Sequence, residues 1–184
     1  GGMQDLGQGE VYYNEGDWIL RTQSGWESAS GLYDYTLFYP IVRNTSAETL
    51  QIGQLVMADP TDIATGDKLN VIRAITDGTY PIQTMVGVVN TTMLPNEQVY
   101  VLWFGKLSNV PKSNINYNLE SWAEGDVLYP DPLKAGGYTK IKPYAPNLAF
   151  TVAVVQKVNG NNYNLLIRPT LAHDSLLVSG EGEN

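Results

Sequence analysis

The residues of this chain that could do chemistry are few. Cysteine is absent and histidine occurs once, at His173, so disulfides, iron–sulfur clusters, thiol nucleophiles and multi-histidine metal sites are excluded. A serine-type triad would need His173 as its base, but Asp174 and Ser175 are its immediate neighbours in sequence and no G-x-S-x-G turn occurs. We therefore expect no catalytic triad.

The carboxylates are the remaining candidates for metal binding. Asp59, Asp62 and Asp67 lie within nine residues of sequence, but this segment lacks the alternating D-x-D-x-D-G pattern of a calcium loop. We interpret these three side chains as solvated carboxylates in turns. The sequence therefore predicts no metal site.

Paired carboxylates could also hydrolyse glycosides, and the chain offers Glu120 with Glu124 and Glu15 with Asp17. Acidic pairs on β-turns are more often simply solvated. Neither G-x-x-x-x-G-K-[ST] nor G-x-G-x-x-G opens a helix, so no loop is typical of phosphate binding. We predict no catalytic residue and no cofactor, and hence a protein that is not an enzyme.

Aromatic residues are the better candidates for contact with another molecule. The chain holds four tryptophans and twelve tyrosines, which could stack on sugar rings or fill a subunit interface. Trp26, for example, lies in a polar turn between Gly25 and Glu27. The residues that we predict to contact a glycan or a protein partner are Trp26, Tyr33, Tyr35 and Trp122.

Charge and hydropathy limit the partners. The net charge is −8, with 11 basic residues against 19 acidic ones, which cannot supply the broad positive face that binds nucleic acid. The longest apolar run covers residues 99–104, which is the length of a strand and far short of the roughly 20 residues that span a bilayer. We expect neither nucleic acid nor membrane as a partner.

The elements that position these residues are predicted to be β-strands. No stretch of twelve or more residues has apolar positions with helical spacing, and the best helix candidate, residues 114–124, is short and interrupted. Short runs rich in β-branched and aromatic residues recur along the chain between turn residues, which predicts an all-β fold. Asn159-Gly160 predicts a hairpin between the last two runs. The expected strands are residues 18–20, 35–39, 54–57, 71–75, 85–89, 99–104, 127–129, 140–142, 150–156 and 163–168.

Three sequence blocks occur twice in the same order. GQLVMADP at residues 53–60 aligns with GDVLYPDP at 125–132, VGVV at 86–89 with VAVV at 152–155, and VYVL at 99–102 with YNLL at 163–166. The offsets are 72, 66 and 64 residues, because the second copy has shorter connections. Ordered recurrence of three blocks indicates a duplicated β-unit.

The repeats suggest a domain organisation. We predict an N-terminal extension with a small β-hairpin at residues 1–38, a first β-unit at 39–112, a second β-unit at 113–171 packed with the first, and a C-terminal tail at 172–184. The strands of the two units are expected to form one core, which could be barrel-like or a sandwich.

Several motifs of the second unit resemble a β-module of tailed-bacteriophage tail fibres and related virion proteins. They are WAEGDVLY at residues 122–129, AGGYT at 135–139 and APNL at 145–148, with IGQLV at 52–56 and GKL at 105–107 upstream. The stretch from Gly16 to Trp26 resembles the short hairpin that often precedes such modules. Tyr138 stands where the family commonly has leucine.

The resemblance covers about residues 15–171 and implies a non-enzymatic structural role. It implies a homotrimer that docks to other virion proteins, in a virion assembled in the host cytoplasm, and it supplies no catalytic residues. A tail-fibre or attachment module is the leading prediction. The alternatives are a capsid decoration or head-fibre protein, and a carbohydrate-binding receptor module for host surface polysaccharide.

Overall fold

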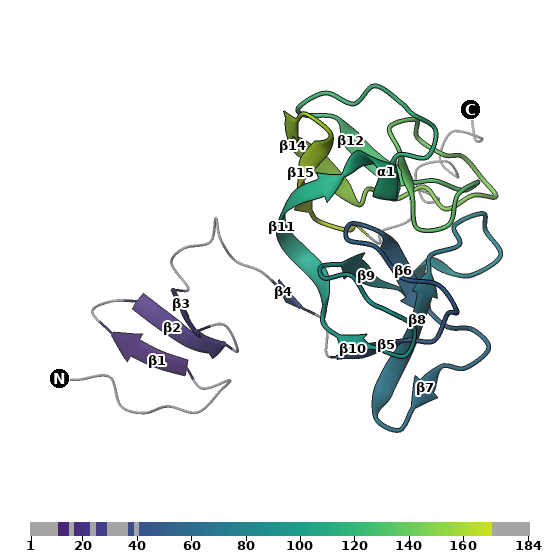
Figure 1. Ribbon diagram of the computed structural model, residues 1–184. Helices are drawn as coiled ribbons and strands as arrows, with labels where there is room; N and C mark the ends of the chain where they lie inside the picture. Colours follow the sequence, from purple (N-terminus) through teal and green to yellow (C-terminus); the bar gives the residue numbers. More distant parts are fainter. Residues whose placement is uncertain (1–10, 15–16, 23–24, 29–36, 39–40, 171–184) are drawn as a thin grey trace, which may run out of the picture. The chain divides into compact units, whose positions relative to one another are not determined.

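The structure is a computed structural model that describes residues 11–14, 17–22, 25–28, 37–38 and 41–170, with side chains described over residues 41–170 (Figure 1). The chain divides into two compact units, Gly1–Tyr35 and Thr36–Asn184, which we call the N-terminal unit and the main unit. The predicted tail at residues 172–184 lies outside the described residues.

The N-terminal unit contains a three-stranded antiparallel sheet in the order β1-β2-β3. Its strands are β1 (Val11–Asn14), β2 (Asp17–Thr22) and β3 (Gly25–Ser28). The hairpin predicted from the sequence corresponds to β2 and β3. The additional strand β1 is rich in the β-branched and aromatic residues that favour strands, and it pairs with β2 through Tyr13 opposite Trp18.

The main unit is built on one mixed sheet of twelve strands, which confirms the predicted all-β class. The sheet follows the order β10-β5-β8-β6-β9-β11-β15-β14-β12-β13, with β4 beside β11 and β7 beside β8. All neighbours are antiparallel except β5 and β8. The strands are β4 (Leu37–Phe38), β5 (Val42–Asn44), β6 (Leu55–Ala58), β7 (Ala64–Thr65), β8 (Lys68–Arg73), β9 (Met85–Val89), β10 (Gln98–Val99), β11 (Val101–Pro111), β12 (Val127–Pro130), β13 (Tyr138–Thr139), β14 (Ala153–Asn159) and β15 (Asn162–Ile167).

Helical structure within the described residues is limited to two single turns, η1 (Ile82–Thr84) and α1 (Lys112–Ile115). The second of these is all that forms from the predicted helix candidate at residues 114–124, because Leu119 has a positive φ of 54° that no helix accepts. No helix in this part of the chain is long and apolar enough to cross a membrane.

One expected strand, residues 140–142, does not form. The backbone N–H of Lys140 donates to the carboxylate of Glu120, and that of Ile141 donates to the hydroxyl of Thr139. Since these two amides are already bonded to side chains, they cannot join a ladder. The strand in this region is the two-residue β13 directly before them.

The duplication predicted from the sequence is reproduced in the register of the strands. We call residues 39–112 and 113–171 the first and second repeats. In the first repeat Leu55 pairs with Val88, and Val88 pairs with Leu102. The aligned residues of the second repeat pair in the same way, because Val127 lies opposite Val154 and Val154 lies opposite Leu166. Thus β6, β9 and the start of β11 correspond to β12, β14 and β15.

The turns that precede the first strand of each repeat also match. Gly53 has a φ of 91° and Gly125 a φ of 90°. The side chain of Gln54 accepts a bond from the N–H of Gln51 at 2.8 Å, and the side chain of Asp126 accepts one from the N–H of Ala123 at the same distance. Each of these residues in the second repeat lies 72 positions after its counterpart in the first, which is the offset of the sequence alignment.

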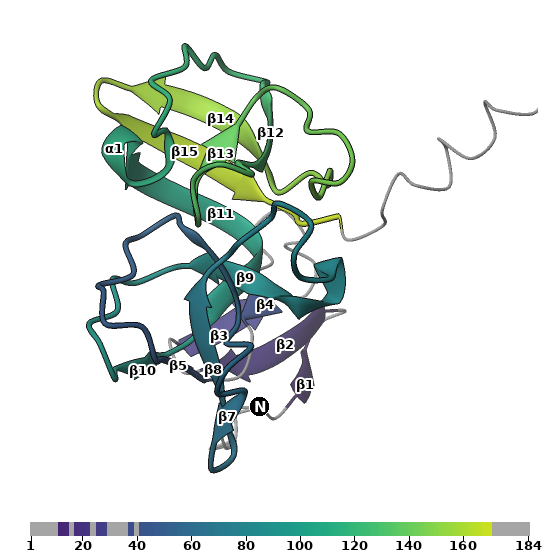
Figure 2. The same cartoon turned by 90° about the vertical axis from the view of Figure 1, so that its right-hand side faces the viewer.

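The strand β11 joins the two repeats (Figures 1 and 2). Its first residues, Val101 and Leu102, pair with β9, and its later residues, from Gly105 to Pro111, pair with β15. In both views β11 passes from the group of strands β5 to β10 to the group formed by β12, β14 and β15. Its eleven residues extend well beyond the run predicted at 99–104, because the neighbour β15 supplies pairing partners for weak strand formers such as Gly105 and Lys106.

Two hydrophobic clusters lie on the two faces of β6 and β9. One, within the first repeat, includes Val56, Val86 and Val101. The other includes Leu55, Met57 and Val88 of the first repeat together with most of the buried side chains of the second. The central strand β9 is therefore buried along its whole length. In the first repeat the pairings run β10-β5-β8-β6-β9-β11, and β10 directly precedes β11 in the chain.

The two corresponding glycines provide a matched test of the fold. Alanine at either position loses about 1–2 kcal/mol because its Cβ disfavours a positive φ. A Cβ on Gly53 would also lie 2.4 Å from Cγ1 of buried Val110, whereas one on Gly125 would have nothing within 4 Å. Urea unfolding should therefore show that Gly53→Ala costs about 1–3 kcal/mol more than Gly125→Ala. Equal losses would contradict this packing.

Candidate functional site: the hollow beside Trp122

A hollow of about 530 Å³ lies on the second repeat, where the end of β11 and α1 meet the β14–β15 turn. It contains Trp122, one of the four residues predicted to contact a partner. Most of its other side chains are polar. The lining residues are Pro111, Lys112, Ser113, Asn116, Leu119, Glu120, Ser121, Trp122, Asn161, Asn162 and Tyr163.

Two aromatic rings form the floor of the hollow. The centroids of Trp122 and Tyr163 lie 4.9 Å apart with their planes tilted by 33°. Only 5% of Trp122 and 1% of Tyr163 are exposed, and both belong to the hydrophobic core. In the duplicated alignment Trp122 corresponds to the fully buried Leu50, so this position faces the interior in both repeats. Trp122 therefore presents almost no ring surface to the hollow.

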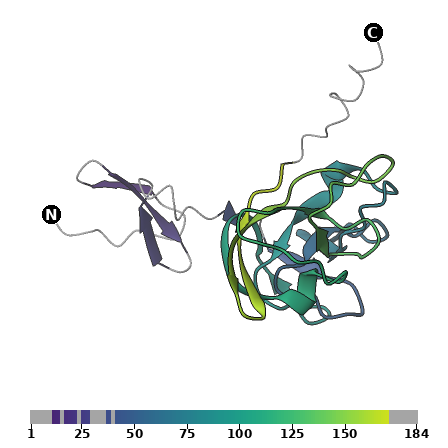
Figure 3. The same ribbon diagram turned by 90° about the horizontal axis from the view of Figure 1, so that it is seen from above.

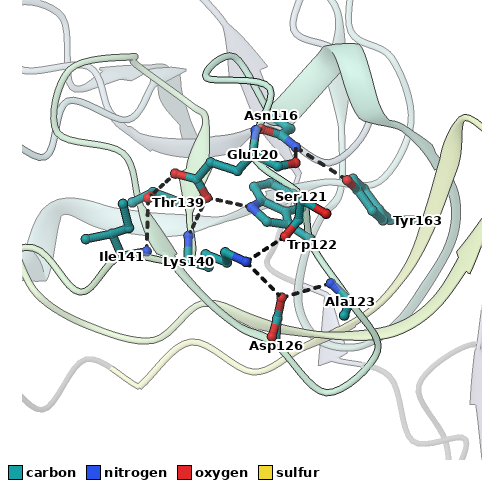
Figure 4. Close-up of polar contacts among 10 residues, drawn as sticks. All are labelled: Asn116, Glu120, Ser121, Trp122, Ala123, Asp126, Thr139, Lys140, Ile141 and Tyr163. Atoms are coloured by element: carbon teal, nitrogen blue, oxygen red, sulfur yellow. Dashed lines mark hydrogen bonds and ion pairs between the residues drawn. The ribbon is translucent and has the colours of Figure 1, made fainter.

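Glu120 holds the loop around Trp122 in place (Figure 4). One carboxylate oxygen accepts bonds from Nε1 of Trp122 at 2.6 Å and from the backbone N–H of Lys140 at 2.8 Å. The other accepts a bond from the hydroxyl of Thr139 at 2.5 Å. Three donors, one from the Trp122 loop and two from the end of β13 and the residue after it, therefore converge on this one carboxylate.

The environment of Glu120 favours its ionised form. Partial burial alone would raise its pKa, but the hydrogen bonds from Thr139, Lys140 and Trp122 and the positive charge of Lys140 outweigh burial and hold the pKa below 4.5. A general acid in a glycosidase needs a raised pKa, so this carboxylate is unsuited to that role. Glu124, its predicted partner, is exposed in the following turn.

Asn116 closes the polar network behind the hollow. Its side-chain amide donates to the carbonyl of Glu120 at 2.8 Å and to the hydroxyl of Tyr163 at 3.4 Å, and its oxygen accepts the N–H of Glu120 at 2.9 Å. In the first repeat Asn44 donates to the carbonyl of Glu48 in the same way, again with the 72-residue offset. Extending the sequence alignment upstream would have identified both asparagines.

The rim of the hollow carries polar groups that are not engaged by the described part of the chain. Within residues 41–170 the side-chain amides of Asn161 and Asn162 and the hydroxyl of Ser113 have no hydrogen-bond partner. Nζ of Lys112 lies 4.9 Å from the centroid of the Tyr163 ring, a cation–π contact that leaves its N–H donors available. No sequence pattern marks these four residues, because they are common surface types that only the fold brings together.

The carboxylates predicted to be solvated differ from one another. Asp62 and Asp67 are exposed, but Asp59 is only 7% exposed, so the prediction is wrong for this residue. Burial alone would raise the pKa of Asp59, yet hydrogen bonds from Thr45 and Thr61 outweigh it and lower the pKa. Asp131, its counterpart in the second repeat, accepts the N–H of Leu133 as Asp59 accepts that of Thr61. These aspartates therefore stabilise turns.

The structure places the other candidate residues as follows. Trp26 lies in β3 of the N-terminal unit, and Asp17 begins β2. Tyr33, Tyr35, Glu15 and His173 lie outside the described residues. Among the residues that are described, no group of three or more histidine, cysteine, aspartate or glutamate side chains could hold a metal ion.

Comparison with protein-family models, with curated proteins and with solved structures finds no match to this chain. The resemblance to phage fibre modules therefore depends on the motifs quoted above and stays a prediction. The departure from these motifs, Tyr138, has a structural role. Tyr138, which replaces the usual leucine, is fully buried and donates through its hydroxyl to the carbonyl of Gly53 at 2.7 Å, so it links the second repeat to the first.

The lowered pKa of Glu120 predicts how stability depends on pH. A carboxyl whose pKa is lower in the folded state stabilises the fold above its unfolded value of about 4.5, and this stabilisation is lost as the pH falls through the folded value. Glu120→Gln keeps the shape and most of the bonds but removes the charge. Urea titrations between about pH 6 and about pH 3 should show a shallower loss of stability in the variant than in the wild type. Identical slopes would contradict this role of Glu120.

Proposed function

We propose that this chain is a non-enzymatic structural module of a tailed-bacteriophage virion, most simply a tail-fibre or attachment module. It acts by assembling with itself, as a homotrimer, and by docking to other virion proteins. The motifs of the two repeats are the source of this proposal. Its localisation is the virion, after assembly in the host cytoplasm.

One observation of the site carries the structural role. Three carboxylates accept several hydrogen bonds each from the backbone and side chains of nearby residues: those of Glu120, Asp59 and Asp131. Such groups hold turns rigid and are not available to activate a substrate. A duplicated strand framework whose polar groups stabilise its own loops suits a particle component that must persist outside the cell.

The mass of the protein in solution tests whether it assembles as a homotrimer. Sedimentation velocity over a wide concentration range should give a species with three times the 20.2 kDa mass of the chain. The reason is that a β-module of this class leaves surface for other chains, which low charge and many Tyr and Asn residues favour. A monomer at every concentration would contradict self-assembly. Immunogold labelling of particles would then separate a tail fibre from a head fibre or capsid decoration.

Binding of a host surface glycan is a second candidate function, favoured by the hollow. Its unengaged amides, the hydroxyl of Ser113 and the Lys112 amine gather above the buried aromatic floor, and sugar hydroxyls are bound by such hydrogen-bonding groups in a hollow. The predicted contact residue Trp122 belongs to this floor, whereas Trp26 lies in the N-terminal unit.

The glycan function predicts saturable binding of a host oligosaccharide to this hollow. Removing two of the unengaged polar groups with the double variant Ser113→Ala/Asn161→Ala should weaken binding by about tenfold or more, because each lost hydrogen bond costs about 1 kcal/mol. Calorimetric titration measures this, with Gln83→Ala, an exposed side chain of the first repeat, as the matched control. A glycan panel without any saturable response would exclude this function.

A further inference from the structure

The outer face of the second repeat carries a continuous row of apolar side chains. Val127 of β12 lies opposite Val154 of β14, and Val154 lies opposite Leu166 of β15, so the three side chains are direct neighbours across three strands. Tyr129 lies two residues along β12 from Val127, on the same face. We call these four residues the outer row.

The outer row is exposed in a way that its counterpart is not. The aligned residues of the first repeat, Leu55, Val88 and Leu102, pair in the same register but are at most 1% exposed. They belong to the cluster that the second repeat completes. In contrast, Val127 is 38% exposed, and the other three residues of the outer row are only half-buried.

The first repeat shows what covers such a face. The second repeat docks next to Leu55, whose N–H donates to the carbonyl of Gly136 at 3.0 Å. The N–H of Gly136 in turn donates to the carbonyl of Ala74 at 3.0 Å. The chain therefore already buries one copy of this face against its own polypeptide. β14 and β15, the yellow-green ribbons of Figure 3, lie at the boundary of the main unit and carry the second copy of the face.

The charged residues near the outer row indicate what kind of surface could pack against it. The four strands of the second repeat's sheet, β11, β15, β14 and β12, contain no aspartate or glutamate. The exposed Lys157 lies on β14, and Lys106, which already interacts with another group, stands opposite Leu166 at one end of the outer row. The strands that carry the outer row therefore hold lysine and no carboxylate, on a chain whose net charge is −8; the carboxylates nearest to Val127 in sequence are Glu124 and Asp126, in the turn before it. Such a face attracts an acidic surface that also offers apolar side chains.

The first repeat of another copy offers loops of this kind. Its loops pair exposed apolar residues with exposed carboxylates, because Ile63 is 55% exposed next to exposed Asp62, and Leu94 is 53% exposed at the loop that Glu97 closes. The N–H of Leu94 donates to the carboxylate of Glu97 at 2.8 Å, which fixes this pairing. Loops that combine an exposed apolar side chain with a carboxylate complement an apolar row that has a lysine beside it.

We propose that the outer row is the self-association surface of this protein, and that it receives the first-repeat loops around Ile63 and Leu94 of a second copy. This inference rests on the proposed function, because it names the surface through which the module assembles. The contact is head-to-tail, since two different surfaces meet. Such contacts generate closed rings, of which a trimer is one, or open fibres.

The test is sedimentation equilibrium of the full chain with single lysine variants. Val127→Lys and Val154→Lys should each raise the dissociation constant by tenfold or more, because they place a charge at the centre of the contact. Ile63→Lys should do the same from the partner side. Leu133→Lys is the matched control, since Leu133 is 83% exposed in a loop of the second repeat and lies outside both surfaces. Thermal unfolding at a dilution where the wild type is dissociated checks that each variant folds, and Val127 tolerates a lysine best because it is the most exposed of the row.

The outcomes separate the surface from the function. An assembling wild type that dissociates in the outer-row and Ile63 variants supports the proposal. Assembly that survives Val127→Lys in a folded chain overturns the outer row while leaving the proposed function intact. Loss in the outer-row variants without loss in Ile63→Lys overturns the first-repeat loops as the partner. A wild type that never assembles overturns the proposed function together with the surface.

Discussion

The pairing of β11 with β15 is the interaction on which the rest of the main unit depends. Through it, a strand that begins in the first repeat becomes the neighbour of the last strand of the second. Without this pairing the two repeats would be separate short sheets, each with an open edge and too little core. With it, the apolar face formed by Leu55, Val88 and Leu102 is closed by residues of the second repeat. The hollow and the outer row are both consequences, because they occupy the positions of the second repeat that have no such cover.

The two repeats share their turn chemistry and differ in what surrounds it. Gly53 and Gly125 have the same backbone conformation, but Gly53 is packed against Val110 and Gly125 is open. Glu48 and Glu120 follow matching asparagines, yet Glu48 forms an exposed ion pair with Arg73 whereas Glu120 binds three donors around Trp122. The matching turns therefore have only a structural role in the first repeat, whereas in the second repeat the turn borders a hollow with unengaged polar groups.

Much of the fold follows from the sequence, because its causes are local. β-Branched runs between Gly, Asn and Pro residues predict most of the strands, and Asn159-Gly160 predicts the hairpin of β14 and β15, in which Gly160 takes a φ of 53°. The aligned blocks even predict the shared register. The predictions that are wrong concern residues whose hydrogen-bond partners lie far away in the sequence. The sequence predicts a strand at residues 140–142, but the backbone N–H of Lys140 donates to the carboxylate of Glu120 and is not available for a ladder. Asp59 is predicted to be solvated, but it is buried and accepts a hydrogen bond from the hydroxyl of Thr45.

The site is less predictable than the fold for the same reason. Trp122 could be singled out as an aromatic residue, yet its burial depends on a core to which Tyr163 contributes from a strand 41 positions further along the chain. Lys112, Asn161 and Asn162 have no distinguishing pattern in the sequence and meet only because β11 and β15 pair at Pro111 and Asn162. The exposure of the outer row is likewise invisible to a hydropathy pattern, because Leu166 and its buried counterpart Leu102 are the same residue type.

The central claim is that the chain carries the same apolar face twice, buried once within the chain and once between chains. Hydroxyl-radical footprinting of dilute and concentrated protein tests it most directly, because it reports the accessibility of each side chain in the intact molecule. We expect oxidation of Tyr129 and Leu166 to fall on concentration while that of exposed Leu133 and Tyr144 stays constant. Unchanged oxidation of Tyr129 and Leu166 in a protein that has assembled would contradict the claim.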